Sequence, residues 1–272
     1  MELTAEQKIE KVKNLRPIDD VFFEVLARNP AVCQEMLRPL MSDPALIVVD
    51  SVVQSSERNL YGRSVRLDAL CKLGTGALVN IEVQRSDNDD HLKRIRFCVA
   101  CRANAASITL KESQSGTDFE KIPELYIIYI SEFDFLHGGK TLYHVDKVLR
   151  ETGEIIDDGE HTICVNTVVD DGTDIAELMS CFTKKLVTSG RFPILSNEVH
   201  MLKETEGGTK AMCDVMRHYE DIARNEGIQQ ATLQSLRNIM ERLSLSASAA
   251  MEALGIPAAE QGMYLQMLEN VR

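Results

Sequence analysis

Residues 64–84 read SVRLDALCKLGTGALVNIEVQ, and this stretch decides the fold class. Residues 64–73 alternate between two kinds of side chain, as a β-strand with two different faces does. Gly74-Thr75-Gly76 is a turn signal, and residues 77–84 are rich in apolar and β-branched side chains. The stretch therefore predicts a β-hairpin with a tight turn.

The register of this hairpin decides which side chains share a face. A turn centred on Thr75 opposes residues whose numbers sum to 150. It places Asp68 opposite Glu82, with Cβ atoms about 4.5–5.5 Å apart. It also places Arg66 opposite Gln84. Because they are two residues apart on one strand, Glu82 and Gln84 point to the same face.

Two carboxylates opposed on a sheet repel each other, and a divalent cation between them removes that repulsion. Asp and Glu oxygens are hard ligands that suit Mg²⁺ or Mn²⁺. Such a cation lowers the pKa of a bound water molecule and stabilises charge on a phosphate oxygen. Gln84 is not a base near neutral pH, but its amide can orient a water molecule or donate to a phosphate oxygen. The same pattern also fits a solvated hairpin face with mixed charges, and the spacing alone does not decide between the two interpretations.

Outside the hairpin, the hydrophobic pattern predicts a mixed α/β region followed by a helical one. Helical and strand-like segments alternate up to about residue 170, and helical periodicity dominates beyond it. We therefore expect an α/β core over residues 1–170 and a helical region over 171–272. Further strands are expected at 45–53, 124–131, 141–149 and 161–169. Helices are expected at 18–28, 30–41, 89–110, 174–188, 194–203, 209–225 and 226–243, with two short ones within 246–269.

The composition is that of a globular chain in a reducing compartment. Its 272 residues are 44% hydrophobic and 26% charged, which is enough to bury a core. The first 17 residues carry charges throughout, which argues against a signal peptide, and no apolar run is long enough to predict a membrane span. The seven cysteines are scattered and odd in number, which favours reduced thiols. We expect a cytoplasmic protein without membrane contact.

The net charge of −12 argues against a nucleic-acid-binding protein until it is divided along the chain. Residues 1–115 contain 16 basic and 16 acidic side chains, whereas residues 116–272 contain 14 basic and 26 acidic ones. Between residues 58 and 102, nine basic side chains accompany five acidic ones. The charge therefore permits a local DNA-binding face, and it suggests a different role for the acidic second half.

At Asp68 and Glu82-Val83-Gln84 the chain resembles the D…ExQ form of the PD-(D/E)XK nuclease signature. A similarity to the PD-(D/E)XK nuclease family transposases, also called recombination-promoting nucleases, extends in order over most of the chain. The similar stretches are the opening helix IDDVFFEVLA (18–27), Arg66-Leu67-Asp68, Val79–Gln84, the next helix with Arg94, Arg96 and Phe97, the apolar run Leu125–Ile130 and the ending Leu243–Leu268.

This resemblance implies a restriction-endonuclease-like core and Mg²⁺-dependent hydrolysis of DNA phosphodiesters, with Mn²⁺ as a possible substitute. It implies Asp68 and Glu82 as metal ligands, and Gln84 at the position where the wider superfamily usually has lysine. Acidic residues of the first helix often join such sites. The candidates are Asp20 and Glu24, which also suit a helix-dipole partner and a surface charge. DNA-backbone contacts are expected from Arg66 and, on the following helix, Lys93, Arg94 and Arg96.

Two departures from the family pattern leave a second hypothesis open. The tyrosines that usually follow the ExQ strand are replaced by Phe97 and Cys98, and Gln84 cannot abstract a proton. The alternative to a working endonuclease is a catalytically silent nuclease fold that acts as a DNA- or protein-binding module. The acidic C-terminal region is expected to mediate something other than DNA contact, such as self-association into a homo-oligomer, partner binding or autoinhibition.

Overall fold

The structure is a computed structural model that describes residues 4–53, 56–58, 64–66, 68–85, 91, 93 and 123–269. The chain forms two compact units, one of Met1–Glu57 with Val65–Val215 and one of Arg58–Ser64 with Met216–Arg272. The division predicted between residues 170 and 171 stays a prediction.

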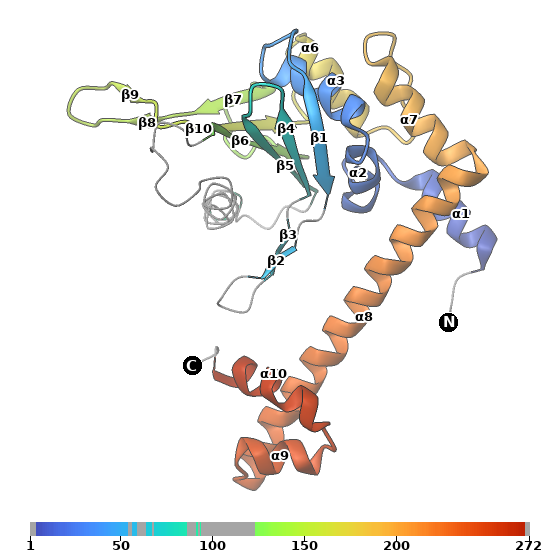
Figure 1. Ribbon diagram of the computed structural model, residues 1–272, viewed down its shortest axis with the longest axis vertical. Coiled ribbons are helices and arrows are strands. Elements are labelled where there is room, and N and C mark those ends of the chain that lie inside the picture. Colours follow the sequence, from blue (N-terminus) through green and yellow to red (C-terminus); the bar gives the residue numbers. More distant parts are fainter. Residues whose placement is uncertain are drawn as a thin grey trace. The chain divides into compact units, whose positions relative to one another are not determined.

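A six-stranded mixed sheet forms the centre of the first unit (Figure 1). Its strand order is β1-β4-β5-β6-β10-β7. The pairs β5–β6 and β6–β10 are parallel, and the other three pairs are antiparallel. This architecture confirms the expected mixed α/β class. The strands are β1 (Val48–Val53), β4 (Ala69–Leu73), β5 (Leu78–Gln84), β6 (Leu125–Ser131), β7 (Leu142–Val145) and β10 (Glu160–Asn166), and two small ribbons pair β2 (Ser56–Arg58) with β3 (Ser64–Arg66) and β8 (Lys147–Val148) with β9 (Ile155–Ile156).

Among the described residues, five helices lie wholly in the first unit, and three of them start at a side chain that caps the helix. Asn29 accepts a hydrogen bond from the backbone N–H of Ala31 at 3.0 Å, just before a helix that begins at a proline. Thr173 accepts one from the N–H of Ala176 at 3.2 Å at the start of another helix. The five are α1 (Ala5–Asn14), α2 (Asp20–Ala27), α3 (Pro30–Leu40), α6 (Asp174–Phe182) and α7 (Pro193–Glu204).

Helices α2 and α3 pack against one face of the sheet (Figure 1). Ser51 of β1 donates a hydrogen bond to the carbonyl of Ala27 at 2.7 Å. On the same face, the thiol of Cys71 on β4 meets that of Cys33 on α3. The even-numbered side chains of β5 lie on the other face of the sheet and therefore point away from these helices. The odd-numbered side chains of β5 are buried in the core: Val79, Ile81 and Val83.

Lys203 on α7 is a buried cation that joins three segments of the first unit. Its amine donates to the backbone carbonyl of Lys13 at 3.2 Å and to the carbonyls of Leu15 and Lys185. It also lies 5.0 Å from the ring centre of Phe22. Burial lowers the pKa of Lys203 to about 8. The three carbonyl contacts fix the end of α1 against α7.

The second unit has its own apolar core, formed by the later part of α8 (Glu206–Leu243) with α9 (Ala247–Ala253) and α10 (Ala258–Glu269). Ser246 caps α9 by accepting a hydrogen bond from the N–H of Ala249 at 3.3 Å. No described helix is both long and apolar enough to cross a bilayer. The buried core residues are Leu233, Leu236, Ala250, Met251, Ile256 and Tyr264.

Two of the predicted strands are interrupted in the structure. The strand expected over 64–73 breaks at a bend at Asp68, where the side chain accepts a hydrogen bond from β5. The strand expected over 141–149 divides into β7 and β8, and β9 lies between the expected strands, where none is predicted. The strand expected over 161–169 ends at Asn166, whose side chain accepts the N–H groups of the next residues, Val168 and Val169.

The helical predictions need three corrections. The helix expected over 174–188 ends at Phe182. Beyond it the backbone turns, and the carbonyl of Lys185 accepts a hydrogen bond from Lys203. The helices expected at 209–225 and 226–243 are one continuous helix, α8, because a single interior glycine costs a helix only about 1 kcal/mol. Helix α1 has no counterpart among the predicted elements. Of the helix expected over 89–110, only residues 91 and 93 lie within the described part of the chain.

Candidate functional site

The β4–β5 hairpin has the predicted register. Its four paired positions are Ala69 with Ile81, Leu70 with Asn80, Cys71 with Val79 and Lys72 with Leu78, and each pair sums to 150. The turn between the strands contains Gly76 at φ +92°, a conformation that a side chain would oppose. The ladder ends at Ala69 and Ile81, and Asp68 lies at the bend just before β4, where its side chain contacts that of Glu82.

Asp68 and Glu82 form a carboxylate pair that the surrounding backbone holds in place. The backbone N–H of Val83 donates to Oδ2 of Asp68 at 2.9 Å. In return, the backbone N–H of Asp68 donates to the carboxylate of Glu82, and the two carboxyl groups are themselves hydrogen-bonded. The amide Nδ2 of Asn80 donates to Oε1 of Glu82 at 3.0 Å. These three N–H groups arrange both carboxylates before any cation is bound.

The environment of the pair opposes a second negative charge. Burial, and after it the charge of Asp68, raise the pKa of Glu82 well above its ordinary value of 4.5. The hydrogen bonds from Asn80 and from the backbone of Asp68 act in the opposite direction. A carboxylate pair of this kind takes up either a proton or a cation, so the site favours a cation over two free charges.

The neighbours of Glu82 include an aromatic group that sequence reasoning missed. Glu82 and Tyr129 are paired positions on β5 and β6 and share a face. The hydroxyl of Tyr129 lies 3.4 Å from Nδ1 of His91, and the His91 ring stacks on Phe135 with 5.2 Å between ring centres. His91 therefore lies over the face that carries the pair.

Asn80 was also missed, although a signal for it exists in the sequence. It is two residues before Glu82, so the alternation of the strand places both on one face. Its side chain is only 5% exposed. Its cross-strand neighbours on that face are apolar, Leu70 on β4 and Ile127 on β6. A buried amide among apolar side chains is costly unless it has a specific partner, and Glu82 is that partner.

The other predicted site residues are Gln84 and the basic side chains that are expected to contact DNA. Gln84 lies two residues beyond Glu82 on the same face and pairs with Ser131 of β6 in the ladder. Arg66 belongs to β3, which pairs with β2 in a separate ribbon, so the backbone of the described chain does not pair it with Gln84. Lys93 is exposed on a helical position, whereas Arg94 and Arg96 lie outside the described residues.

Asp20 and Glu24, the candidates from the first helix, lie on α2, which packs against the opposite face of the sheet. Glu24 is buried and forms an ion pair with Arg28 at 2.6 Å. Within the described chain, no group of three or more His, Cys, Asp or Glu side chains is arranged to hold a metal ion. The arrangement therefore gives no support to a third carboxylate at the pair.

A network of two arginines and two acids fixes the strand ends beside the site. Arg85 directly follows Gln84 and donates to Oδ1 of Asp19 at 2.9 Å, at the start of α2. Arg16 pairs with Glu132, the residue after β6, at 2.6 Å. These contacts tie the start of α2 to the carboxyl ends of β5 and β6.

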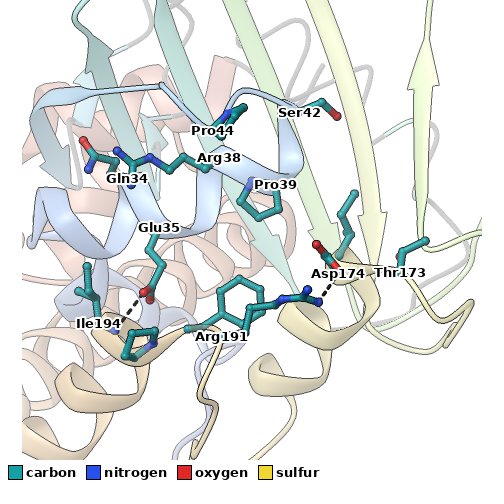
Figure 2. A pocket seen from close by; sticks show the side chains of 13 residues that line it. Gln34, Glu35, Arg38, Pro39, Ser42, Pro44, Thr173, Asp174, Arg191 and Ile194 are labelled. Carbon is teal, nitrogen blue, oxygen red and sulfur yellow. Dashed lines mark hydrogen bonds and ion pairs between the residues drawn. The ribbon is translucent and has the colours of Figure 1, made fainter.

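A separate cavity of about 720 Å³ lies between α3 and the starts of α6 and α7 (Figure 2). Glu35 accepts hydrogen bonds there from the backbone N–H groups of Ile194 at 3.0 Å and Leu195 at 2.7 Å. Arg191 pairs with Asp174. Neither carboxylate of the hairpin lines this cavity. Its charged groups therefore stabilise a junction of helices.

The hairpin and its neighbouring strands fall in a region that a known family shares. Residues 52–162 match the family model of the PD-(D/E)XK nuclease family transposases. This confirms the resemblance suggested by the D…ExQ spacing, and the matched region contains Asp68, Glu82 and Gln84. No curated protein and no solved structure matches the chain.

The residues present fit a divalent cation, which PD-(D/E)XK nucleases generally use. The two opposed carboxylates supply hard oxygen ligands, and Mg²⁺ commonly takes only one or two carboxylates together with water and phosphate oxygens. The carbonyl oxygen Oδ1 of Asn80, beside Glu82, is buried and lacks a hydrogen-bond partner. A cation with its hydration shell would satisfy all three groups.

Proposed function

We propose that this chain is a metal-dependent DNA endonuclease that hydrolyses phosphodiester bonds, of the recombination-promoting, transposase-like kind. The observation that carries the proposal is the contact between Asp68 and Glu82, inside the region that matches the nuclease family. The family supports a nuclease function, and the raised pKa of Glu82 supports a site that takes up a cation.

In this proposal Asp68 and Glu82 hold Mg²⁺, for which Mn²⁺ can substitute. When bound, the cation lowers the pKa of a water molecule and stabilises negative charge on the phosphate. Gln84, on the same face, donates a hydrogen bond to a phosphate oxygen or orients the attacking water. Its amide accepts no proton near neutral pH, so Gln84 would not act as the general base.

Binding of DNA in this proposal depends on basic side chains around the hairpin. Arg66, Lys93, Arg94 and Arg96 contact phosphates, and the balanced charge of residues 1–115 permits that contact. The acidic second half of the chain does not bind DNA, so the affinity for DNA is modest and falls with salt. Asp20 and Glu24 are not part of the proposed site, because α2 packs against the opposite face of the sheet.

Nicking of supercoiled plasmid in the presence of Mg²⁺ or Mn²⁺ tests this function. Asp68→Asn and Glu82→Gln should each lower the rate by at least about 100-fold, because even outer partners of metal ligands are worth up to about 100-fold. Asp146→Asn is the matched control, since it removes an exposed carboxylate outside the hairpin. Equal nicking by the wild type and both hairpin variants would show that the activity arises elsewhere.

The second candidate function is a silent nuclease fold that binds DNA or protein. It is favoured by the lack of a third metal-ligating side chain among the described residues and by glutamine at position 84. Titration with Mn²⁺ discriminates the two functions. Saturable binding that Asp68→Asn abolishes supports the endonuclease, whereas the absence of binding with DNA affinity retained supports the binding module.

A further inference from the structure

Asn80 is the least expected side chain on the face that carries the carboxylate pair. It occupies the middle of β5 and is 5% exposed, with Leu70 and Ile127 as its paired neighbours on β4 and β6. Leu78, Leu125 and Ile127 form an apolar layer beside it. A position of this kind ordinarily holds an apolar side chain, because a buried amide loses its hydrogen bonds to water.

Only one end of this amide is satisfied. Nδ2 donates to Oε1 of Glu82 at 3.0 Å, whereas Oδ1 is buried without a hydrogen-bond partner. Among the described residues, two other buried side-chain polar atoms share this condition, on His161 and Arg237, and neither residue belongs to the hairpin. Buried polar atoms without partners are rare in folded proteins and often mark the place of a water molecule or an ion.

Asn166 shows what a purely structural buried asparagine looks like in the same sheet. It is 1% exposed at the end of β10. Its Nδ2 donates to the carbonyl of Lys140 at 2.7 Å, and its Oδ1 accepts the N–H of Val169 at 3.0 Å. Both ends of the Asn166 amide are thus used by the fold, whereas Asn80 contributes one bond to a carboxylate and leaves its acceptor unused.

We propose that Asn80 is a positioning residue of the metal site: its N–H fixes the Glu82 carboxylate, and its carbonyl oxygen accepts a hydrogen bond from the hydration shell of the bound cation. Mg²⁺ and Mn²⁺ sites of this kind keep several water molecules, and each is a donor that needs an acceptor. Outer partners that orient metal ligands typically contribute about 10–100-fold to metal affinity. This inference rests on the proposed function, because it assumes that the pair binds a cation.

The test compares Mn²⁺ binding and thermal stability in the full chain, by titration calorimetry and by melting in EDTA. Asn80→Leu keeps the approximate shape of the side chain but removes both its donor and its acceptor. It should weaken Mn²⁺ binding by about 10-fold or more. The melting temperature of the cation-free protein should fall less than in Asn166→Leu, because the lost bond to Glu82 is partly offset by the removal of an unsatisfied buried acceptor. Asn80→Val, with a side chain that suits a strand, gives a second measurement if leucine overpacks the site.

Asn166→Leu is the matched control, because the fold alone uses both ends of its amide. It should lower the melting temperature and leave the affinity for Mn²⁺ unchanged. Wild-type affinity for Mn²⁺ in both Asn80 variants would overturn the inference about Asn80 and leave the endonuclease proposal intact. A lack of Mn²⁺ binding by the wild-type protein would instead overturn both. A drop in melting temperature alone, with unchanged affinity, would make Asn80 a structural residue like Asn166.

Discussion

Replacing Glu82 with glutamine should stabilise the cation-free protein, although it removes a proposed metal ligand. The pKa of Glu82 is raised by burial and by Asp68, so the folded state binds more protons than the unfolded state above pH 4.5. The free energy of unfolding therefore falls as the pH rises from 4.5 to the raised pKa. Glutamine has the same shape, accepts the N–H of Asn80, donates to Asp68 and carries no charge.

The size of this effect follows from the contact between the two carboxylates. Two like charges about 4 Å apart repel by about 4 kcal/mol at an effective dielectric constant of about 20. The three N–H groups that face the pair offset part of this repulsion, and we expect a net stabilisation by Glu82→Gln of about 1–3 kcal/mol at pH 8. The pH dependence that the substitution removes amounts to at most about 1.4 kcal/mol per pH unit.

Urea unfolding in EDTA at pH 5 and pH 8 measures the free energy of unfolding of the wild type and of Glu82→Gln. The wild type should be less stable at pH 8 than Glu82→Gln, and the difference should shrink at pH 5. Mn²⁺ should stabilise the wild type at pH 8 and leave the variant unchanged, because only the wild type binds it. Asp146→Asn should follow the wild type throughout. A variant that is less stable than the wild type at pH 8, with the same pH dependence, would refute the charge repulsion on which the site assignment depends.

Three further predictions concern the framework of the molecule. Lys203→Met should lower stability by about 3 kcal/mol, because the carbonyls of Lys13, Leu15 and Lys185 lose their donor, and hydrogen exchange should accelerate in α1. Glu35→Ala should cost about 1–2 kcal/mol in urea unfolding, since its carboxylate caps the start of α7, and Glu35→Gln should recover part of the loss. Leu236→Ala should lower the free energy of unfolding by about 2–5 kcal/mol, because it leaves a cavity in the core of the second unit. The affinity for Mn²⁺ measured by calorimetry should not change. A reduced affinity would contradict a metal site formed by the hairpin alone.

The hairpin could be predicted from the sequence because its signals are local. Alternation over 64–73, the Gly-Thr-Gly turn and the returning strand define one register, and a slip by one residue would expose the core face of β5. The same register brings Asp68 to Glu82. Asn80 could have been found in the same way, since it is two residues before Glu82 on a strand. It was missed because an amide in an apolar run does not indicate a particular chemistry until its partner is known.

The remaining features depend on contacts between distant segments. The place of Tyr129 beside Glu82 is set by the parallel pairing of β5 with β6, and no local pattern encodes that register. The packing of α2 against the opposite face, which separates Glu24 from the pair, depends on contacts such as that between Ser51 and Ala27. Helix α8 continues through Gly227 because one interior glycine costs a helix only about 1 kcal/mol.

The central claim is that Asp68 and Glu82 together bind a divalent cation. Anomalous scattering from crystals of the full chain soaked in Mn²⁺ tests it most directly. The account predicts a peak about 2.0–2.2 Å from an oxygen of each carboxylate, with the carboxyl groups no longer bonded to each other. Crystals without a peak at this position, in which Asp68 and Glu82 keep their mutual hydrogen bond, would contradict it.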